Sequence, residues 1–166
     1  MEQKIEIWLI RHGKTPENEQ HRYIGWLDSS LGSAGKAELI RASETVSKVW
    51  VTNRRRTQET AQILFPGAEQ ILVPGLEEMN FGSFEGKNFE EMQNDSAYRS
   101  WVESGCLDVC PGGEQSSFLQ PRLQRFFGAD PGMAAERTAG SLSGCGPRRH
   151  ADGSVRTIRR TEKKLL

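Results

Sequence analysis

The sequence predicts an α/β protein with a mostly parallel sheet. Strand-like and helix-like segments alternate up to about residue 127, which is typical of a parallel sheet covered by helices. All 13 aromatic residues lie before residue 128, so the part of the chain that can build a core ends there. A length of 166 residues with 36% hydrophobic residues fits a single domain with an ordinary core.

The elements follow from hydrophobic periodicity and from stop signals at Pro and Gly. In the first segment Ile5, Ile7 and Leu9 alternate and Ile10 follows, as in a strand that becomes buried on both faces. The further expected elements are a helix at 33–46 capped by Ser33, a strand at 48–52, a helix at 56–64, a strand at 70–73, a helix at 88–103 and a helix from about 116 to 127. The expected buried side chains of helix 88–103 are Phe89, Met92 and Trp101.

Charge divides the chain into two parts. Residues 1–127 carry 14 basic and 18 acidic side chains, whereas residues 128–166 carry 8 and 4, and the two parts cancel to a net charge of zero. This balance disfavours binding to nucleic acid or to a membrane surface through bulk charge. We therefore expect an incomplete α/β domain over 1–127 and a poorly ordered basic tail over 128–166, since a tail rich in Gly, Arg, Ala and Ser buries little surface.

Several class-level expectations follow from what the sequence lacks. No apolar run approaches the roughly 18 to 20 residues of a membrane helix, and the N-terminus has no secretory h-region. Cys106, Cys110 and Cys145 are an odd count without zinc-like spacing. The sequence thus predicts a cytoplasmic protein with reduced cysteines and without a metal or another cofactor.

Three residues with phosphate chemistry follow the first strand. The carboxyl ends of strands in open α/β sheets are where ligands bind. Arg11 offers a guanidinium fork to phosphate oxygens, neutral His12 offers a ring nitrogen that can attack phosphorus, and Gly13 allows close approach of the backbone. Without further context, an Arg-His pair is as readily a surface pair without function. The segments that follow in the sequence therefore decide between this interpretation and a phosphate site.

These segments resemble the histidine phosphatase superfamily, especially its short alpha-ribazole phosphatase and phosphoglycerate mutase-like branch. In order, the chain shows R-H-G-K-T at 11–15 with Asn18, R-Y-I-G-W-L-D-S-S-L at 22–31, T-N-R-R-R-T-Q-E-T-A at 52–61, L-E-E-M-N-F-G at 76–82, F-E-G at 84–86 and P-G-G-E at 111–114. The resemblance implies a three-layer α/β/α fold with a mostly parallel sheet, whose C-terminal part would be missing or non-native in this chain.

The resemblance also implies the central catalytic groups. It makes His12 the nucleophile that becomes phosphohistidine, and Arg11 and Arg56 the charge clamp on the phosphoryl group. No metal is needed, because the two guanidinium groups neutralise the phosphoryl charge. Arg54 and Arg55 could instead be read as part of a nucleic-acid patch, but without interleaved aromatics a solvated helix start is the better interpretation.

Three further residues match family positions. Glu78 matches the proton donor, which would protonate the leaving alcohol and later accept a proton from water; the alternative is a surface carboxylate beside Glu77. Asn18 and Gly25 match residues that line the phosphate pocket, and simple loop or turn roles are the alternative for each.

One family motif is absent. The family carries a second histidine in H-G-G or H-Q-G after a later buried strand, but here His150 lies between Arg149 and Ala151 with no strand-like segment before it. If the codons of residues 145–154 are read one base later, permissible third bases give V-V-H-G-G-T-L-M-A, and the same shift over 159–166 gives G-G-P-K-K-S-Y-Y. We therefore hypothesise that the chain from near Phe127 onward is frameshifted.

The expected function is a metal-independent phosphomonoesterase, impaired in this chain, that hydrolyses a small phosphorylated metabolite such as alpha-ribazole 5′-phosphate or a sugar phosphate. Two alternatives are a phosphoglycerate mutase-type phosphotransferase and a non-catalytic pseudoenzyme that binds a phosphorylated metabolite or inorganic phosphate. A nucleic-acid binder rests only on the basic tail. The sequence leaves the oligomeric state open.

Overall fold

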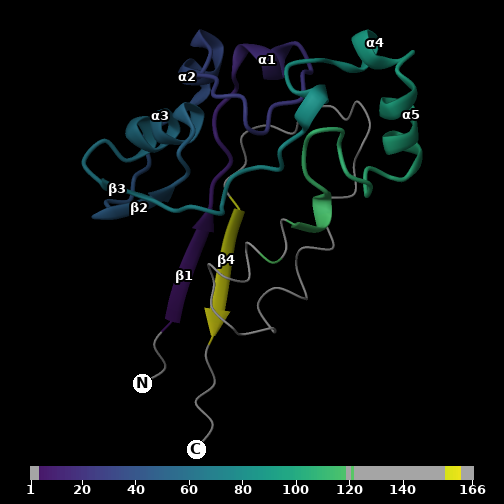
Figure 1. Ribbon diagram of the computed structural model, residues 1–166. Helices are drawn as coiled ribbons and strands as arrows, with labels where there is room; N and C mark the ends of the chain where they lie inside the picture. The colour runs from purple at the N-terminus through teal and green to yellow at the C-terminus, as the bar shows by residue number, and fades with distance from the viewer. Residues whose placement is uncertain (1–3, 119–120, 122–155, 162–166) are drawn as a thin grey trace, which may run out of the picture.

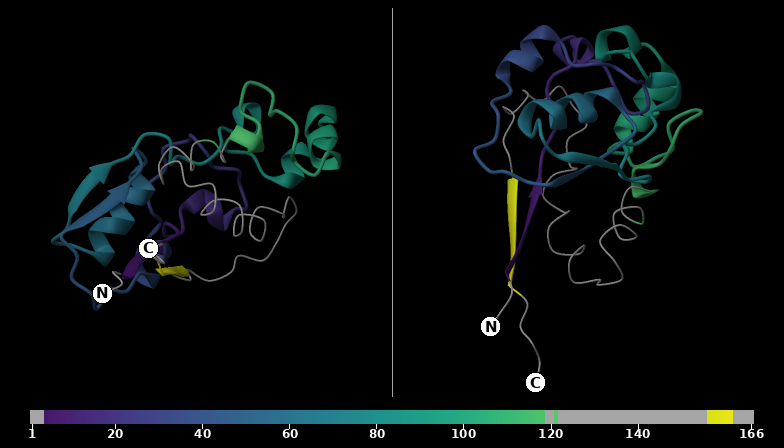
Figure 2. Two further views of the ribbon diagram at one scale, coloured as in Figure 1. Left: turned by 90° about the horizontal axis from the view of Figure 1, so that it is seen from below. Right: turned by 90° about the vertical axis from the view of Figure 1, so that its left-hand side faces the viewer.

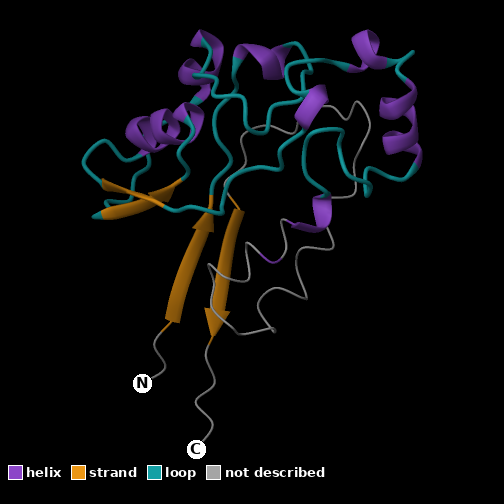
Figure 3. Cartoon of the chain, viewed as in Figure 1, coloured by secondary structure: helices purple, strands orange, loops and turns teal. Residues whose placement is uncertain are grey.

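The computed structural model describes residues 4–118, 121 and 156–161. The helices gather at one end of the molecule, and the pair of β1 and β4 projects away from them in Figures 1 and 3 and in the right-hand view of Figure 2. In chain order the elements are β1 (Lys4–Leu9), α1 (Pro16–Glu19), α2 (Ser33–Glu38), β2 (Lys48–Val51), α3 (Arg55–Leu64), β3 (Glu69–Leu72), η1 (Gly82–Phe84), α4 (Phe89–Met92), α5 (Ser96–Glu103), η2 (Ser116–Phe118) and β4 (Arg156–Thr161).

The predicted fold class, a mixed α/β protein with a parallel sheet, is confirmed. β2 and β3 pair in parallel with Val51 opposite Leu72, as expected for two strands joined through a helix. α3 lies against this pair (Figure 1), where Val51 and Leu64 are buried and the Gln70 side chain donates to the Gln58 carbonyl at 3.1 Å. The strand at 48–52, the helix at 56–64 and the strand at 70–73 are each found within one residue of the prediction.

The first strand departs from the expected sheet. β1 pairs antiparallel with β4 along its whole length and is not hydrogen-bonded to β2 or β3. Leu9, expected in a strand buried on both faces, is 46% exposed. Among the described residues, the extensive contact of β1 with another element is that with β4, and the right-hand view of Figure 2 shows the pair extending beyond the helices. β4 was not predicted, since the composition of the tail favours no strand.

Two predicted helices are interrupted. The helix expected at 33–46 ends at Glu38, and Gly32 rather than Ser33 is its N-cap. Beyond the end of α2, Ile40 is 82% exposed, so this apolar residue of the predicted helix is not buried. The helix expected at 88–103 is two helices, because Asp95 caps α5 by accepting from the backbone N–H groups of Ala97 and Tyr98.

A cluster of buried side chains lies between α4, α5 and the segment at 79–84. Its members are Met79, Phe84, Met92, Tyr98, Trp101, Cys106 and Cys110. The burial predicted for Met92 and Trp101 is confirmed, whereas that of Phe89 is wrong: Phe89 is 51% exposed, and its ring meets the edge of the cluster at Tyr98, with ring centroids 6.3 Å apart. The cluster supports the segment at 79–85, which borders the candidate site.

The cysteine prediction is wrong for Cys106, which forms a disulfide, because sequence spacing does not report which sulfur atoms meet in space. Cys110 is a free, buried thiol, and burial with the nearby Glu85 charge raises its pKa to about 11. In the described ranges, no helix is long and apolar enough to cross a bilayer. Most of the predicted tail, including His150 and Cys145, and residues 122–127 of the expected last helix lie outside the described residues.

Candidate active site

His12 lies just past β1 and has a defined tautomer. Its Nδ1 lies 2.7 Å from the carbonyl oxygen of Gly13, and because a carbonyl only accepts, Nδ1 carries the proton and Nε2 has the free electron pair. Burial lowers the pKa of His12 to about 4 against the opposing effect of this hydrogen bond, and the positive charges of Arg56 and Arg11 lower it further. At neutral pH the imidazole is therefore uncharged and can act as a nucleophile through Nε2.

The loop that carries His12 is anchored on α3. The backbone N–H of Gly13 donates to Oγ1 of Thr60 at 3.0 Å, and the Thr60 hydroxyl donates to the Arg56 carbonyl at 2.6 Å. A Cβ atom at Gly13 would lie 3.1 Å from the carbonyl of Gly35, so the loop also packs closely on α2. These contacts hold His12 next to the first turn of α3, where Arg56 lies.

Arg56 is the most buried charged residue near His12, at 2% exposure. Its Nη1 donates to the carbonyl of Leu27 at 2.8 Å and its Nη2 to the carbonyl of Gly25 at 2.7 Å. Its Nε is buried and has no acceptor within the described part of the chain. Burial lowers the pKa of Arg56, while the charge of Glu78 opposes that shift. A guanidinium has five N–H donors, so this one can hold the loop and still bind an anion.

The neighbouring arginines are not simply a solvated helix start. The Arg54 guanidinium carbon lies 5.5 Å from the centre of the Trp26 ring, within the range of a cation–π contact. The backbone N–H of Arg55 donates to Oδ1 of Asp28 at 2.7 Å, and its side chain forms an ion pair with the same carboxylate at 3.4 Å. With Arg56, all three arginines bind the loop at 25–28.

Arg11 and Glu78 are both exposed and both act on this site through charge. The positive charge of Arg11 reaches His12, and the negative charge of Glu78 reaches Arg56. Oε1 of Glu78 accepts from the backbone N–H of Met79 at 2.8 Å. The structure thus brings His12, Arg11, Arg56 and Glu78 into one electrostatic neighbourhood, although Arg11 and His12 lie more than 40 residues before Arg56 and Glu78 in the chain.

Asn18 and Gly25 have evident structural contacts. Asn18 closes a capping box on α1 with Thr15, in which its Oδ1 accepts from the Thr15 N–H at 3.1 Å and its own N–H donates to the Thr15 hydroxyl at 3.3 Å. Gly25 is buried and supplies one of the carbonyls that bind Arg56. Of the two, Gly25 is connected to Arg56 by a direct hydrogen bond.

Gly25→Ala is expected to destabilise the protein strongly. A Cβ atom there would lie 1.8 Å from the Met79 carbonyl oxygen, which is backbone and cannot move aside without shifting the segment. Overpacking of this kind costs about 1–3 kcal/mol or more, measurable by urea denaturation. Gly67→Ala is the matched control, since nothing lies within 4 Å of a Cβ atom at Gly67. Equal stabilities of the two variants would contradict the close approach.

The sequence analysis missed two acidic residues of this region. Glu85 accepts four backbone hydrogen bonds, three of them from residues 25–27. Glu17 is half-buried, and its Oε2 has no hydrogen-bond partner among the residues that the structure describes. Other hydrogen bonds and the Arg56 charge outweigh its burial and lower its pKa. The F-E-G signature at 84–86 pointed to Glu85 without indicating its partner; Glu17 had no signal in the sequence.

The His12 pKa makes stability depend on pH. The unfolded imidazole titrates near 6.5 and the folded one near 4, so the unfolded chain binds more protons in between, and stability is lost as the pH falls through this interval. Between pH 6.5 and 5, above the main carboxylate range, we expect a loss of about 1.5 kcal/mol from this group. Urea denaturation at both pH values measures it. In His12→Gln, the free energy of unfolding should no longer lose this amount between the two pH values. If the variant loses as much stability as the wild type, His12 is not a buried neutral imidazole.

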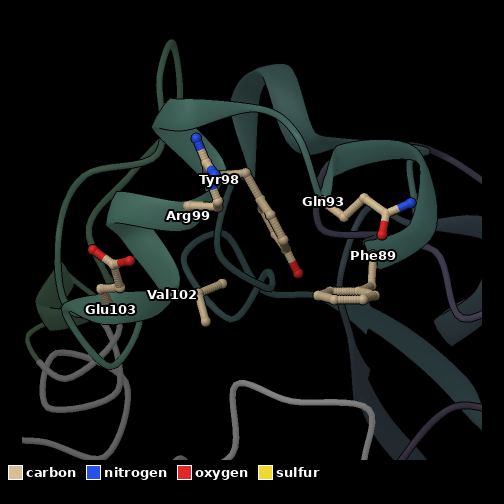
Figure 4. A pocket seen from close by; sticks show the side chains of 6 residues that line it. All are labelled: Phe89, Gln93, Tyr98, Arg99, Val102 and Glu103. Atoms are coloured by element: carbon tan, nitrogen blue, oxygen red, sulfur yellow. The ribbon is translucent and has the colours of Figure 1, made fainter.

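A separate hollow lies between α4 and α5, where Phe89, Tyr98 and Val102 face one another (Figure 4). Its rim is formed by Gln93, Arg99 and Glu103. None of the predicted site residues lines it, so it is not part of the cluster around His12.

The chain belongs to the histidine phosphatase superfamily (branch 1), because the model of this family matches residues 7–138. The match contains His12, Arg56 and Glu78 and ends before His150. Among sequence relatives, the "Probable phosphoglycerate mutase GpmB" of Salmonella paratyphi B is 26% identical over 131 residues, covering 72% of this chain and 60% of that protein. This chain spans 18% to 60% of the length of the curated relatives that it matches.

Solved structures of the same kind superimpose on most of the chain. The phosphoglycerate mutase from Thermus thermophilus is 31% identical with a TM-score of 0.60, covering 74% of this chain and 71% of that one. The alpha-ribazole phosphatase from Shigella flexneri reaches a TM-score of 0.67 at 23% identity, covering 74% of this chain and 65% of that one. The second likeness shows the fold alone, and the first agrees with the family.

Proposed function

We propose that this protein is a metal-independent phosphomonoesterase that acts on a small phosphorylated metabolite through phosphohistidine at His12. The observation that carries the proposal is the state of that imidazole: Nδ1 is held by the Gly13 carbonyl, the ring is neutral, and Nε2 is left to attack next to buried Arg56. Family membership supports the same assignment.

In the first step, Nε2 of His12 attacks phosphorus as the bond between phosphorus and the leaving oxygen breaks. Glu78 must enter this step in its protonated form; it donates that proton to the leaving oxygen, so the product leaves as an alcohol and Glu78 is left as a carboxylate. The imidazole ring becomes cationic, with the hydrogen bond from Nδ1 to Gly13 retained. Arg56 and Arg11 stabilise the charge on the phosphoryl oxygens in the transition state.

In the second step, water attacks phosphorus and the bond between nitrogen and phosphorus breaks. The electron pair returns to Nε2, a water proton passes to Glu78, and inorganic phosphate leaves. Both groups are then in their starting states. Hydrolysis is preferred over a mutase reaction because a mutase must shield its phosphohistidine from water, whereas Arg11 and Glu78 at this site are exposed.

Alpha-ribazole 5′-phosphate and sugar phosphates are the substrates we propose to test first. The names of the structural neighbours include an alpha-ribazole phosphatase and a phosphoglycerate mutase, which keeps a phosphotransferase as the alternative within the enzyme class. A pseudoenzyme is the second candidate function. Its support is the absence of an H-G-G motif from the sequence.

Phosphoenzyme trapping tests the proposal. We expect radiolabelled p-nitrophenyl phosphate to give an acid-labile, base-stable label that His12→Ala abolishes. His21→Asn is the control, since His21 is exposed at a φ of +56°, a conformation that Asn tolerates, and labelling should persist. Phosphate binding without any label would contradict the enzyme assignment and favour the pseudoenzyme.

A further inference from the structure

The Glu85 carboxylate is surrounded by backbone donors. The N–H of Gly25 lies 3.0 Å from Oε2, that of Trp26 2.8 Å from Oε1, and that of Leu27 3.2 Å from Oε2. A fourth, from Phe81, lies 3.0 Å from Oε1. An ionised carboxylate has two oxygens that accept without donating, so it can satisfy all four N–H groups at once. A carboxamide in its place would turn an NH2 group toward some of them.

The same loop binds Arg56 on its other side. The N–H of Trp26 and the carbonyl of Gly25 belong to one trans peptide unit and point in opposite directions. When Glu85 fixes that N–H, it also fixes the direction of the carbonyl that accepts from Nη2 of Arg56 at 2.7 Å. The Leu27 carbonyl, which accepts from Nη1, ends the same three-residue stretch.

Glu85 also joins this loop to the segment that carries Glu78. The N–H of Phe81, three residues after Glu78, donates to Glu85. Because Gly25 has no Cβ atom, the loop can lie close to the Met79 carbonyl of the same segment. A second carboxylate, that of Glu114, accepts from the neighbouring Asn80 N–H at 2.8 Å. The Glu85 side chain thus connects the backbone around Arg56 with the backbone next to Glu78.

We infer that Glu85 is a positioning residue of the active site, which holds loop 25–27 so that the Gly25 and Leu27 carbonyls direct the Arg56 guanidinium toward a phosphoryl group at His12. It acts through Arg56 and is not a catalytic residue. The inference rests on the proposed function for its substrate, an anionic phosphoryl group. Its structural content, that Glu85 sets the position of Arg56, can be measured without turnover.

Glu85→Gln tests this inference through two measurements, the pKa of His12 and the affinity for inorganic phosphate. Misplaced Arg56 no longer lowers the His12 pKa, so we expect that pKa, followed by NMR of the imidazole, to rise above its value of about 4. Loss of the Glu85 charge alone would act in the opposite direction, so a rise reports the displacement of Arg56. We expect the Kd for inorganic phosphate, measured by calorimetry, to increase about 10- to 100-fold, as for an ångström-scale misplacement of a binding group.

Asp95→Ala is the matched control, because Asp95 also accepts two backbone N–H groups but caps α5 outside the site. It should lose stability and keep the wild-type His12 pKa and phosphate affinity. If Glu85→Gln behaves like this control, Glu85 is merely structural and the inference fails. Should Glu85→Gln not fold, Glu85→Asp withdraws the carboxylate by one methylene, and wild-type values in that variant overturn the inference. Failure of wild-type labelling, in contrast, removes only the proposed function.

Discussion

Arg56→Ala is expected to abolish phosphate binding and to destabilise the protein. The variant leaves the carbonyls of Gly25 and Leu27 without their donors and removes the cation on which the Glu78 charge acts. The bond to the Gly25 carbonyl is buried and that to the Leu27 carbonyl is partly buried. A buried acceptor without a partner costs about 1–3 kcal/mol, so we expect a total loss of about 2–4 kcal/mol in urea denaturation. The rate of p-nitrophenyl phosphate hydrolysis should fall at least about 10²-fold for the lost phosphoryl ligand.

Two variants separate the role of Arg56 from a general effect of positive charge. Arg56→Lys should not rescue, because one ammonium on a flexible stem cannot reproduce the planar fork that spans two carbonyls. Arg55→Ala should cost less than about 1 kcal/mol, since its side-chain ion pair with Asp28 is exposed and the backbone bond to that carboxylate remains. Wild-type phosphate affinity in Arg56→Ala would rule out the clamp.

Restoring the alternate reading frame from near residue 128 is expected to raise p-nitrophenyl phosphate hydrolysis about 10²- to 10³-fold over the present chain. The shifted frame supplies H-G-G after an apolar stretch, and its histidine would add a hydrogen-bond donor to the phosphoryl group. Losing one preorganised donor of this kind costs a factor of that size. A full-length assay of both proteins under identical conditions measures the ratio.

The restored protein needs its own control, in which the H-G-G histidine is replaced by alanine. This control should have the low activity of the present chain, although the rest of its C-terminal segment is that of the restored frame. Nucleotide sequencing across codons 120 to 135 is an independent check. A continuous natural reading frame together with equal activities of the restored and present chains would refute the frameshift.

Local sequence predicted the elements around the parallel pair well and the others less well. α3 stops at Phe-Pro-Gly, so its C-terminal end follows from propensity, although its N-cap Arg54 makes no side-chain cap. The end of α2 at Glu38 could not be predicted from local sequence, since no Pro or Gly stop lies between Glu38 and Val46. The place of β1 could not be predicted, since pairing with β4 is a choice between strands more than 140 residues apart.

The candidate site shows the same division. His12, Arg56 and Glu78 were chosen from motifs, and the structure brings them together electrostatically. The chemical state of His12 could not be read from the sequence, because its neutral form depends on burial and on a carbonyl that fixes the tautomer. The buried guanidinium of Arg56 likewise depends on acceptors in a loop some 30 residues earlier in the chain.

The sequence by itself determined which groups are the candidates for the chemistry, and that His12 follows a strand and Arg56 begins a helix, because those properties depend on residue type and short-range spacing. Only the tertiary structure decided how the side chains of these groups are oriented and which backbone groups hold them. Glu85 meets residues 25–27 across some 60 positions of chain through backbone N–H groups, which every residue except proline possesses. Since backbone N–H groups carry no sequence signature, only the folded chain reveals that the Glu85 carboxylate connects the loop that binds Arg56 to the backbone of Phe81.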